Sequence, residues 1–232
     1  MMMHHLARLV FVAALLAATP VHALDRPLNL ITVSGEGEVS VAPDLAILSG
    51  GVTTAGKNAR EASEANARMM TAVMEALKSA GIDEKDIQTA RLSLYPVRDN
   101  SKNGAARITG FQASNQVSIR VRDIAKLSDV IDRLVSAGAN DISGIQFVVS
   151  SPSKPLDEAR EAAIADARRK AEIYAKAAGV LLGRPVSITE EGSVAPGPVV
   201  MMRAAKAEAA TPVSPGEQVQ RVTVSVSYEL QR

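Results

Sequence analysis

The sequence predicts an α+β fold, in which three helices pack on one face of a mostly antiparallel sheet or pair of sheets. Several stretches alternate between apolar and polar residues, as strands with one buried face do. Three longer stretches carry apolar residues at helical spacing, and neighbouring strand-like stretches are joined by short turns. The expected order of elements is β-α-β-β-α-β-α-β-β.

The first strand is predicted at about 30–41. Its alternation allows a continuation past Pro43 to Thr53, but Pro43 is expected to end or kink the strand. The first helix is predicted at about 59–80. Asn58 and Glu61 form a capping box at its start, and Gly81 is a glycine cap at its end. Its apolar stripe comprises Ala62, Ala65, Met69, Val73, Ala76, Leu77 and Ala80.

Two strands follow at about 87–97 and 108–122, joined by the turn-rich segment "DNSKNG" at 99–104. The second of them alternates cleanly, which predicts one buried and one solvated face, as in an antiparallel sheet. Its apolar face comprises Phe111, Ala113, Val117, Ile119 and Val121.

The second helix is predicted at about 124–137, between an Asp123 cap and Gly138, and a short strand at about 142–150 comes next. The third helix, about 155–178, begins with Pro155 and ends at Gly179. Its predicted buried stripe is mostly alanine: Ala159, Ala163, Ala167, Ala171 and Ala178, with Leu156 and Tyr174. Because alanine side chains are short, such a helix can lie unusually close to the sheet that it covers.

The C-terminal part contains a strand near 185–189, a flexible loop at 191–218 and a last strand at about 219–230. The loop is rich in Gly, Pro, Ala and Ser and has no periodicity. Its paired Met201 and Met202 are a candidate contact for a partner. The last strand alternates, and its buried face is predicted to comprise Val222, Val224, Val226, Tyr228 and Leu230.

The first 23 residues have the pattern of a secretory signal peptide. Arg8 precedes an apolar run from Leu9 to Ala18, and a segment with small residues follows it. Cleavage is expected between Ala23 and Leu24, which leaves residues 24–232 as the mature chain. The apolar run has about half the length that a membrane-spanning helix needs, so we expect no membrane span after processing.

Composition excludes many catalytic and binding chemistries. The three histidines, His4, His5 and His22, all lie in the predicted signal peptide, and the chain has no cysteine and no tryptophan. The mature chain therefore lacks the side chains for a Ser-His-Asp triad, a thiolate nucleophile, a Cys/His zinc site or the common haem ligands. We predict no catalytic residues, no cofactor and no metal site.

Charge argues against nucleic acid as a partner. The whole chain has 26 Lys and Arg against 25 Asp and Glu, and removal of Arg8 makes the two numbers equal. A nucleic-acid binder needs a basic surface. The cluster "DARRKAE" at 166–172 places acidic residues beside basic ones on the third helix, which is typical of a solvated, ion-paired face.

The segment "VSGEGEVSVAPD" at 33–44 offers the clearest candidate residues. Glu36 and Glu38 share one face of the strand and, with Asp44, are candidates for acid/base chemistry or cation binding. That face also carries Thr32, Ser34 and Ser40, which favours a solvated face instead.

The glycines of the same segment have a structural interpretation. Gly35 and Gly37 stand on the apolar face, where a missing side chain indicates close approach by another element, and the alanine-lined helix is suited to that approach. The segment lacks the G-x-G-x-x-G pattern of a dinucleotide-binding loop.

Four segments resemble the SIMPL-domain family, formerly a domain of unknown function that includes bacterial periplasmic immunogenic proteins. They are "ITVSGEGEVSVAPDLAIL" at 31–48, "GIDEKDIQT" at 81–89, "GFQASNQVSIRVRD" at 110–123 and "AREAAIADARRKAEIYAKAAG" at 159–179. The resemblance spans about residues 28–230 and is poorest at 191–218. It makes Gly35, Gly37, Pro43 and Asp44 a structural signature, and it implies no catalytic residues.

The resemblance implies an exported periplasmic protein with an α+β fold, a link to oxidative-stress defence and a ring-like homo-oligomer. We therefore expect a non-enzymatic periplasmic homo-oligomer with a structural or oxidative or envelope-stress role. The alternative is a periplasmic module that binds a peptide, an envelope component or a small ligand through the loop 191–218 or a strand edge. A third hypothesis is an enzyme that depends on Glu36, Glu38 and Asp44.

Overall fold

The computed structural model describes residues 29–99, 107–192, 198–199 and 213–232. The predicted signal peptide and most of the predicted loop 191–218, with Met201 and Met202, lie outside these residues. The helices and strands are β1 (Leu30–Val41), β2 (Leu45–Gly56), α1 (Ala59–Ser79), β3 (Ile87–Asp99), β4 (Arg107–Val121), α2 (Leu127–Ser136), β5 (Asp141–Val148), α3 (Ser153–Ala177), β6 (Leu181–Glu191), β7 (Pro198–Val199) and β8 (Glu217–Gln231). Short 3-10 turns, η1 (Glu84–Asp86) and η2 (Ile124–Lys126), precede β3 and α2.

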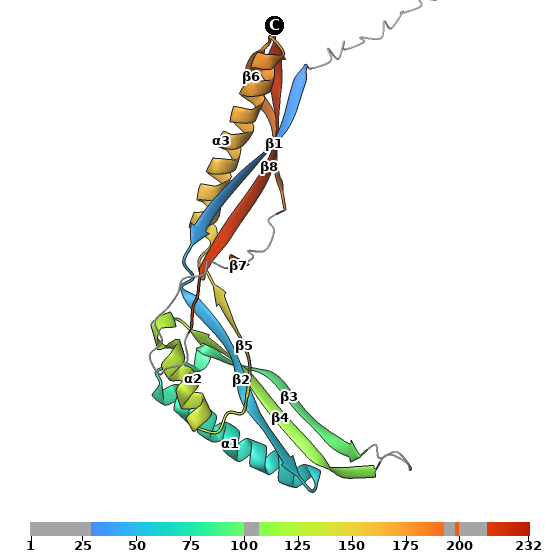
Figure 1. The fold of residues 1–232 in the computed structure, drawn as a ribbon, viewed down its shortest axis with the longest axis vertical. Coiled ribbons are helices and arrows are strands. Elements are labelled where there is room, and N and C mark those ends of the chain that lie inside the picture. Colours follow the sequence, from blue (N-terminus) through green and yellow to red (C-terminus); the bar gives the residue numbers. More distant parts are fainter. Residues whose placement is uncertain (1–28, 100–106, 193–197, 200–212) are drawn as a thin grey trace, which may run out of the picture.

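The elements form two lobes that lie end to end in an elongated molecule (Figure 1). In the first, which we call the α1–α2 lobe, the strand order is β3-β4-β2-β5, and α1 and α2 cover one face of the sheet. In the second, the α3 lobe, the strand order is β1-β8-β6 with β7 beside β8, and α3 covers one face. All strand pairs are antiparallel. The predicted α+β fold is confirmed.

The first strand ends before Pro43, as expected of this proline, and it does not continue to Thr53. β1 ends at Val41, β2 begins at Leu45, and the two strands belong to different sheets. Pro43 has no backbone N–H to donate to a strand partner and has a fixed φ, so it interrupts the pairing although the alternation continues on both sides. The chain crosses between the lobes at this point.

The caps predicted for α1 and the glycine ends of all three helices are confirmed. Asp123 caps the η2 turn that precedes α2, and α3 begins at Ser153, two residues before the predicted start at Pro155. The Glu61 amide donates to Asn58 Oδ1 at 2.9 Å, and the Lys57 amide donates to Glu61 Oε2 at 3.0 Å. Gly81, Gly138 and Gly179 follow the three helices with positive φ, which glycine adopts at no steric cost.

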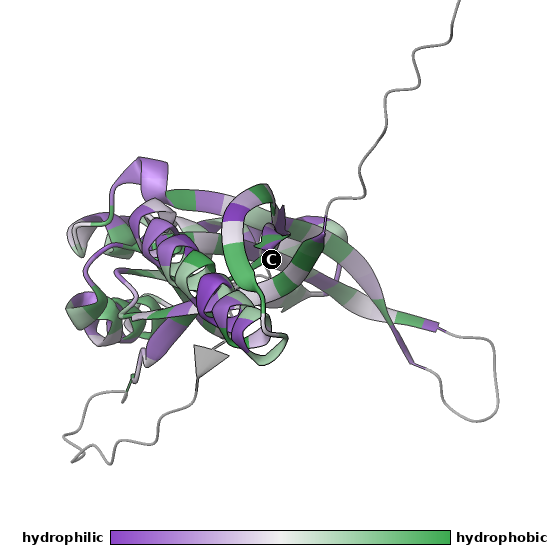
Figure 2. Cartoon of the chain, turned by 90° about the horizontal axis from the view of Figure 1, so that it is seen from above, coloured by the Kyte–Doolittle hydropathy of each residue, from purple (hydrophilic) through white to green (hydrophobic). Residues whose placement is uncertain are grey.

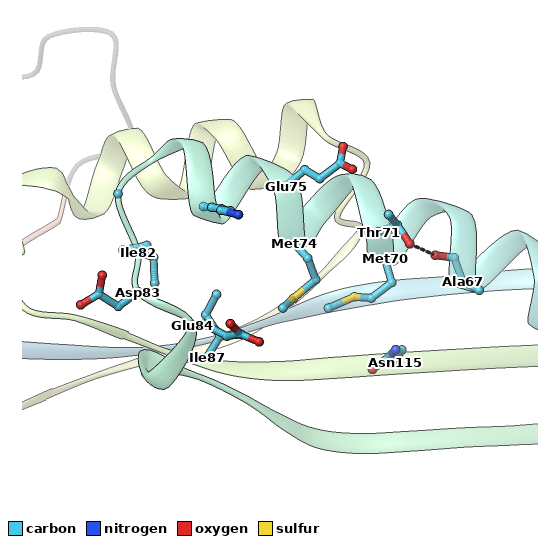
Figure 3. A pocket seen from close by; sticks show the side chains of 12 residues that line it. Ala67, Met70, Thr71, Met74, Glu75, Ile82, Asp83, Glu84, Ile87 and Asn115 are labelled. Atoms are coloured by element: carbon cyan, nitrogen blue, oxygen red, sulfur yellow. Dashed lines mark hydrogen bonds between the residues drawn. The ribbon is translucent and has the colours of Figure 1, made fainter.

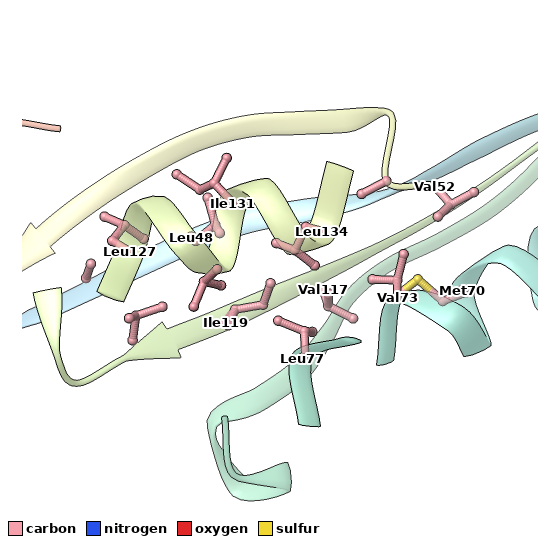
Figure 4. Packing of buried hydrophobic residues seen from close by; sticks show 14 residues of the cluster. Leu48, Val52, Met70, Val73, Leu77, Val117, Ile119, Leu127, Ile131 and Leu134 are labelled. Atoms are coloured by element: carbon pink, nitrogen blue, oxygen red, sulfur yellow. The ribbon is translucent and has the colours of Figure 1, made fainter. Parts of the chain in front are cut away.

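Side chains from β2, β4, α1 and α2 form the core of the α1–α2 lobe (Figure 4). The predicted apolar face of β4 is buried at Ala113, Val117, Ile119 and Val121. Asn66 is a buried polar residue on α1, and its Nδ2 donates to the carbonyls of Val52 and Ala113 at 2.7 and 3.2 Å. This amide therefore joins the helix to two neighbouring strands.

The core of the α3 lobe is thin because alanines supply the helix side of it. The buried alanines of α3 repeat every four residues: Ala159, Ala163, Ala167, Ala171 and Ala175. They pack on Val33 of β1 and on Val222, Val224, Val226 and Tyr228 of β8, as the alternation of the last strand predicts. In Figure 2 hydrophilic and hydrophobic residues alternate along the strands.

Two residues of the predicted alanine stripe are placed wrongly. Ala178 is the exposed C-cap of α3, and Ala175 occupies the buried position in its place. Tyr174 is 58% exposed, because it precedes the buried position by one residue and so points away from the sheet.

Candidate functional site

The candidate carboxylates of β1 point to solvent. Glu36 and Glu38 are exposed on the face of β1 that does not contact α3, and Glu38 forms an exposed ion pair with Arg221 of β8. Asp44 lies beyond the end of β1 and binds Ser150 instead. The structure therefore does not bring Glu36, Glu38 and Asp44 together, and no group of three or more acidic side chains in the described residues is arranged to hold a metal ion.

Gly35 and Gly37 lie directly against the backbone of α3. A Cβ added to Gly35 would lie 2.5 Å from the Ala167 nitrogen and closer still to the Ala163 carbonyl oxygen. A Cβ added to Gly37 would lie 2.6 Å from the Ala163 nitrogen and closer still to the Ala159 carbonyl oxygen. The close approach of the alanine-lined helix, inferred from the sequence, is confirmed.

The same approach lets α3 cover the outer edge of β1. Asp166 Oδ2 accepts a hydrogen bond from the Glu36 amide at 3.1 Å, and Lys170 Nζ donates to the Ser34 carbonyl at 2.9 Å. Lys170 and Arg169 both pair with Asp166, and these contacts hold the pKa of Asp166 well below its usual range. The cluster at 166–172 is ion-paired, as predicted, and it also satisfies two backbone groups at an otherwise open strand edge.

Asp44 lies at the junction of the two lobes. Its Oδ1 accepts from the Ser150 amide and its Oδ2 from the Ser150 hydroxyl, both at 2.6 Å. These two bonds to Ser150 lower the pKa of Asp44. Gln218 adds a third contact here, since its Nε2 donates to the Phe147 carbonyl at 2.6 Å. Asp44 thus fastens the β1–β2 connection to the β5–α3 connection.

The edge strand β3 carries apolar side chains that the described residues leave partly uncovered. Leu92 and Leu94 are opposite Asn115 and Ala113 of β4, so they point to the face of the sheet on which α1 lies. They are nevertheless 72% and 47% exposed. Ile108, near the start of β4, is also exposed.

A cavity lies beside this strand, between α1, the η1 turn and the sheet (Figure 3). It has a volume of about 710 Å³. Met70 and Met74 point from α1 toward the sheet, and Asn115 of β4 lies beneath them. The cavity was not predicted from the sequence: α1 has the spacing of an ordinary amphipathic helix, and nothing in that spacing shows where β3 diverges from it.

Comparison with protein families supports the resemblance found in the sequence. Residues 31–228 match the SIMPL family, described as a protein of unknown function (DUF541). Within the described residues no helix combines the length and apolar character that crossing a membrane requires.

Comparison with curated proteins gives relatives of similar length. The chain is 38% identical over 210 residues to the 26 kDa periplasmic immunogenic protein of Brucella melitensis. The matched region covers 86% of this chain and 84% of that protein. It is 31% identical over 195 residues to the uncharacterized protein YggE of Escherichia coli K12. This matched region covers 84% of this chain and 78% of that protein. Neither name denotes an enzymatic activity. The family match and the extent of these similarities show that this chain belongs to the SIMPL family.

Proposed function

We propose that the chain is exported, is cleaved between Ala23 and Leu24, and acts in the periplasm as a homo-oligomer. In this proposal residues 24–232 form one SIMPL-like domain with a flexible loop at 191–218. Its role is either structural or a part of the response to oxidative or envelope stress, and it is not enzymatic. The name of the Brucella relative, which places that protein in the periplasm, supports the location.

The observation that carries the oligomer is the edge strand β3, whose outer edge pairs with no other strand among the described residues. An unpaired strand edge presents backbone N–H and C=O groups that can pair with another chain. On β3 this edge adjoins Leu92 and Leu94, which are 72% and 47% exposed. Burial of such side chains stabilises association by roughly 25 cal/mol per Å² of apolar area. A second copy of the chain would satisfy the backbone edge and cover the leucines at once.

The edge of the other sheet differs in how it is covered. On β1, Asp166 and Lys170 of α3 bind two backbone groups of the edge. On β6, the opposite edge strand, Val186 and Ile188 are exposed. The apolar surface available for association therefore lies along β3 and β6 rather than along β1.

Mass measurement of the mature chain tests the proposal. Residues 24–232 at micromolar concentration should elute as an assembly in size-exclusion chromatography with light scattering. The double substitution Leu92→Lys/Leu94→Lys should lower the measured mass. It places two positive charges on the contact surface of each copy, and these charges oppose burial in the contact. Circular dichroism should show that the variant keeps its secondary structure.

The matched control is Ser63→Lys/Ser136→Lys, which adds the same charge at exposed positions on α1 and α2. It should leave the mass unchanged. A monomeric mature chain, or a Leu92→Lys/Leu94→Lys variant with the full mass of the assembly, would overturn the oligomer through β3. For the stress role, cells lacking the chain should survive peroxide poorly, and the unmodified chain should restore survival better than the β3 variant.

A further inference from the structure

The free edge of β3 is short because two features interrupt it. Among the described residues β3 is the outer strand of its sheet and pairs only with β4. Ala90 has no partner in the register with β4, and such a bulge bends a strand and disturbs the spacing of its outer N–H and C=O groups. At the other end, Pro96 has no N–H to donate. The edge that another strand can pair with is therefore 91–95.

Pro96 also shows which backbone groups of this edge point outward. A proline within a sheet has its nitrogen on the side that faces no other strand, so the backbone of Pro96 points away from β4. Backbone groups of successive residues point to alternate sides of a strand, so the N–H and C=O groups of Leu92 and Leu94 point outward as well. The Val97 carbonyl accepts a hydrogen bond from Thr109 Oγ1 of β4 at 3.2 Å and so points inward, as this alternation requires. The outward groups of the edge therefore belong to the two leucines.

Such an edge is suited to pairing with a second copy of itself. In an antiparallel pair with a two-fold axis at Ser93, Leu92 lies opposite Leu94 of the second copy, and the two residues exchange both of their hydrogen bonds. An axis at Leu94 would place Leu92 opposite Pro96, which donates no hydrogen bond, and an axis at Leu92 would place Leu94 opposite the bulge. An axis at Arg91 would bring like charges together. The edge therefore favours the register centred on Ser93.

The side chains across this axis are complementary on both faces of the sheet. Leu92 and Leu94 point to the face on which α1 lies, so the leucines of the two copies cover one another there. Arg91 and Tyr95 point to the opposite face, where the Ser93 hydroxyl donates to the Tyr95 hydroxyl at 3.0 Å. Each arginine lies opposite the tyrosine of the second copy. Arg91 forms no ion pair within the described residues and Tyr95 is 46% exposed, so the guanidinium and the ring can form a cation–π contact.

The helices of two such copies do not collide. Asn66 of α1 donates to the carbonyls of Val52 on β2 and Ala113 on β4, so α1 lies above the boundary between these two strands rather than above β3. With neighbouring strands about 4.8 Å apart, the two α1 helices of the pair would be roughly 19 Å apart. Helices in direct contact lie about 8–10 Å apart. The space between the helices therefore accommodates the leucines of both copies.

We propose that a second copy of the chain adds to β3 in antiparallel orientation, about a two-fold axis at Ser93, and joins the two sheets of the α1–α2 lobes into one. Leucines form the contact on one face of this sheet, and Arg91 meets Tyr95 on the other. This inference rests on the proposed oligomer through β3, to which it adds the symmetry, the register and the contact of Arg91 with Tyr95. A head-to-tail contact of β3 with β6 of another copy would produce none of these residue pairs.

The absence of cysteine allows a direct test of the register. Ser93→Cys places two thiols at the axis of a non-hydrogen-bonded pair, where Cα atoms lie about 4.5 Å apart, within the range of a disulfide. The chain has no other cysteine, so oxidation of the variant mature chain with copper phenanthroline should give a covalent dimer that a thiol reductant separates. Tyr95→Cys is the matched control on the same strand and face. Its two thiols would be roughly 13 Å apart and should not join.

Leu92→Cys and Leu94→Cys give a second measure of the register. Mixed together, the two variants should form a disulfide between unlike copies, because these positions lie opposite each other. Each variant alone should form far less, since like positions are offset along the strand. This mixture keeps the test conclusive where Ser93→Cys itself disturbs assembly.

The contact between Arg91 and Tyr95 has a test of its own. Arg91→Gln and Tyr95→Leu should each raise the dissociation constant of the pair at least about fivefold. Because both remove the same contact, the double variant should raise it by little more than either single variant. Lys176→Gln removes an exposed charge from α3 and should leave it unchanged. Sedimentation equilibrium of the four variants and the unmodified mature chain would measure these constants.

The outcomes separate the register from the oligomer itself. A monomeric mature chain would overturn both proposals. An assembly in which neither Ser93→Cys nor the mixed leucine variants form a disulfide would overturn the two-fold register and leave the oligomer standing. Cross-linking of Tyr95→Cys as readily as of Ser93→Cys would also overturn the register. Additive effects of Arg91→Gln and Tyr95→Leu would overturn the contact between these two residues.

Discussion

At the scale of single residues, the two glycines of β1 are required by the position of α3. The Ala163 backbone lies between them, with its oxygen facing Gly35 and its nitrogen facing Gly37. Any side chain on these two residues would occupy the space of a helix backbone, which cannot turn aside as a flexible side chain can. Glu36 and Glu38 point the other way, into solvent. Gly35 and Gly37 are therefore the residues of this segment that the packing of α3 requires, whereas Glu36 and Glu38 are not required by it.

We expect Gly35→Val and Gly37→Val each to destabilise the fold by about 3 kcal/mol or more, because overpacking against rigid backbone exceeds the usual cost of a larger core side chain. Glu36→Gln and Glu38→Gln should change stability by less than about 1 kcal/mol, as expected for exposed positions. Thermal and urea unfolding followed by circular dichroism would measure both. Equal melting temperatures for the four variants would contradict this explanation.

At the scale of elements, an ion pair joins the η1 turn to the end of β4. Arg122 donates to Asp86 through Nε at 2.8 Å and through Nη2 at 2.7 Å, and Asp86 is buried. This bidentate contact fixes the entry of the chain into β3. Arg122, through its hydrogen bonds and its charge, holds the pKa of Asp86 below its usual value.

This pair should make stability depend on pH. Because the pKa of Asp86 is lower in the folded than in the unfolded protein, its contribution is present above the unfolded value of about 3.9 and is lost as the pH falls through the folded value. Asp86→Asn should therefore lower the melting temperature at neutral pH and reduce the further decrease on acidification from about pH 6 to about pH 3. Scanning calorimetry across this range would measure it.

Asp99→Asn serves as the control, since Asp99 lies at the exposed end of β3. It should leave the acid sensitivity of the protein intact. The pKa values of Asp44, Asp166 and Glu190 are also lowered, so Asp86→Asn should remove only part of that sensitivity. A variant with the full acid-dependent decrease would show that Asp86 contributes nothing to it.

At the scale of the whole molecule, two lobes with separate cores are held together by a small junction. β1 and β2 follow each other in sequence but belong to different sheets, and the β5–α3 connection crosses back beside them. Asp44 binds Ser150 across these two connections, and its amide donates to the Val148 carbonyl at 3.2 Å. Within the described residues, the two lobes are therefore joined by a few hydrogen bonds and share no hydrophobic cluster.

We expect Asp44→Ala to loosen this junction while both lobes stay folded. Exchange of the Ser150 amide hydrogen should become faster, because its acceptor is removed, and small-angle scattering should indicate a broader range of shapes. Ser40→Ala, at an exposed position on β1, is the matched control and should change neither measurement. Unchanged Ser150 exchange in Asp44→Ala would rule out this role.

Much of the fold could be predicted because its signals are local. The capping residues Asn58 and Glu61 are three positions apart, and the buried face of β8 follows from alternation alone. The same locality explains the errors. Alternation on both sides of Pro43 indicates strand, but it says nothing about which sheet each half joins. Tyr174 fits an apolar stripe approximately, and only the four-residue spacing of the buried alanines in α3 places it outside.

The candidate site also combines features that the sequence predicts with features that it does not predict. Opposite faces for the glycines and the glutamates of β1 follow from the two-residue period of a strand, so the sequence by itself determined that Gly35 and Gly37 face an apolar neighbour. The partners of Asp44 and Asp86 lie 106 and 36 residues away along the chain, and the cavity beneath Met70 depends on how far β3 diverges from α1. Only the tertiary structure decided these features, because contacts between distant segments depend on how whole elements pack and leave no periodic signal in the residues that make them.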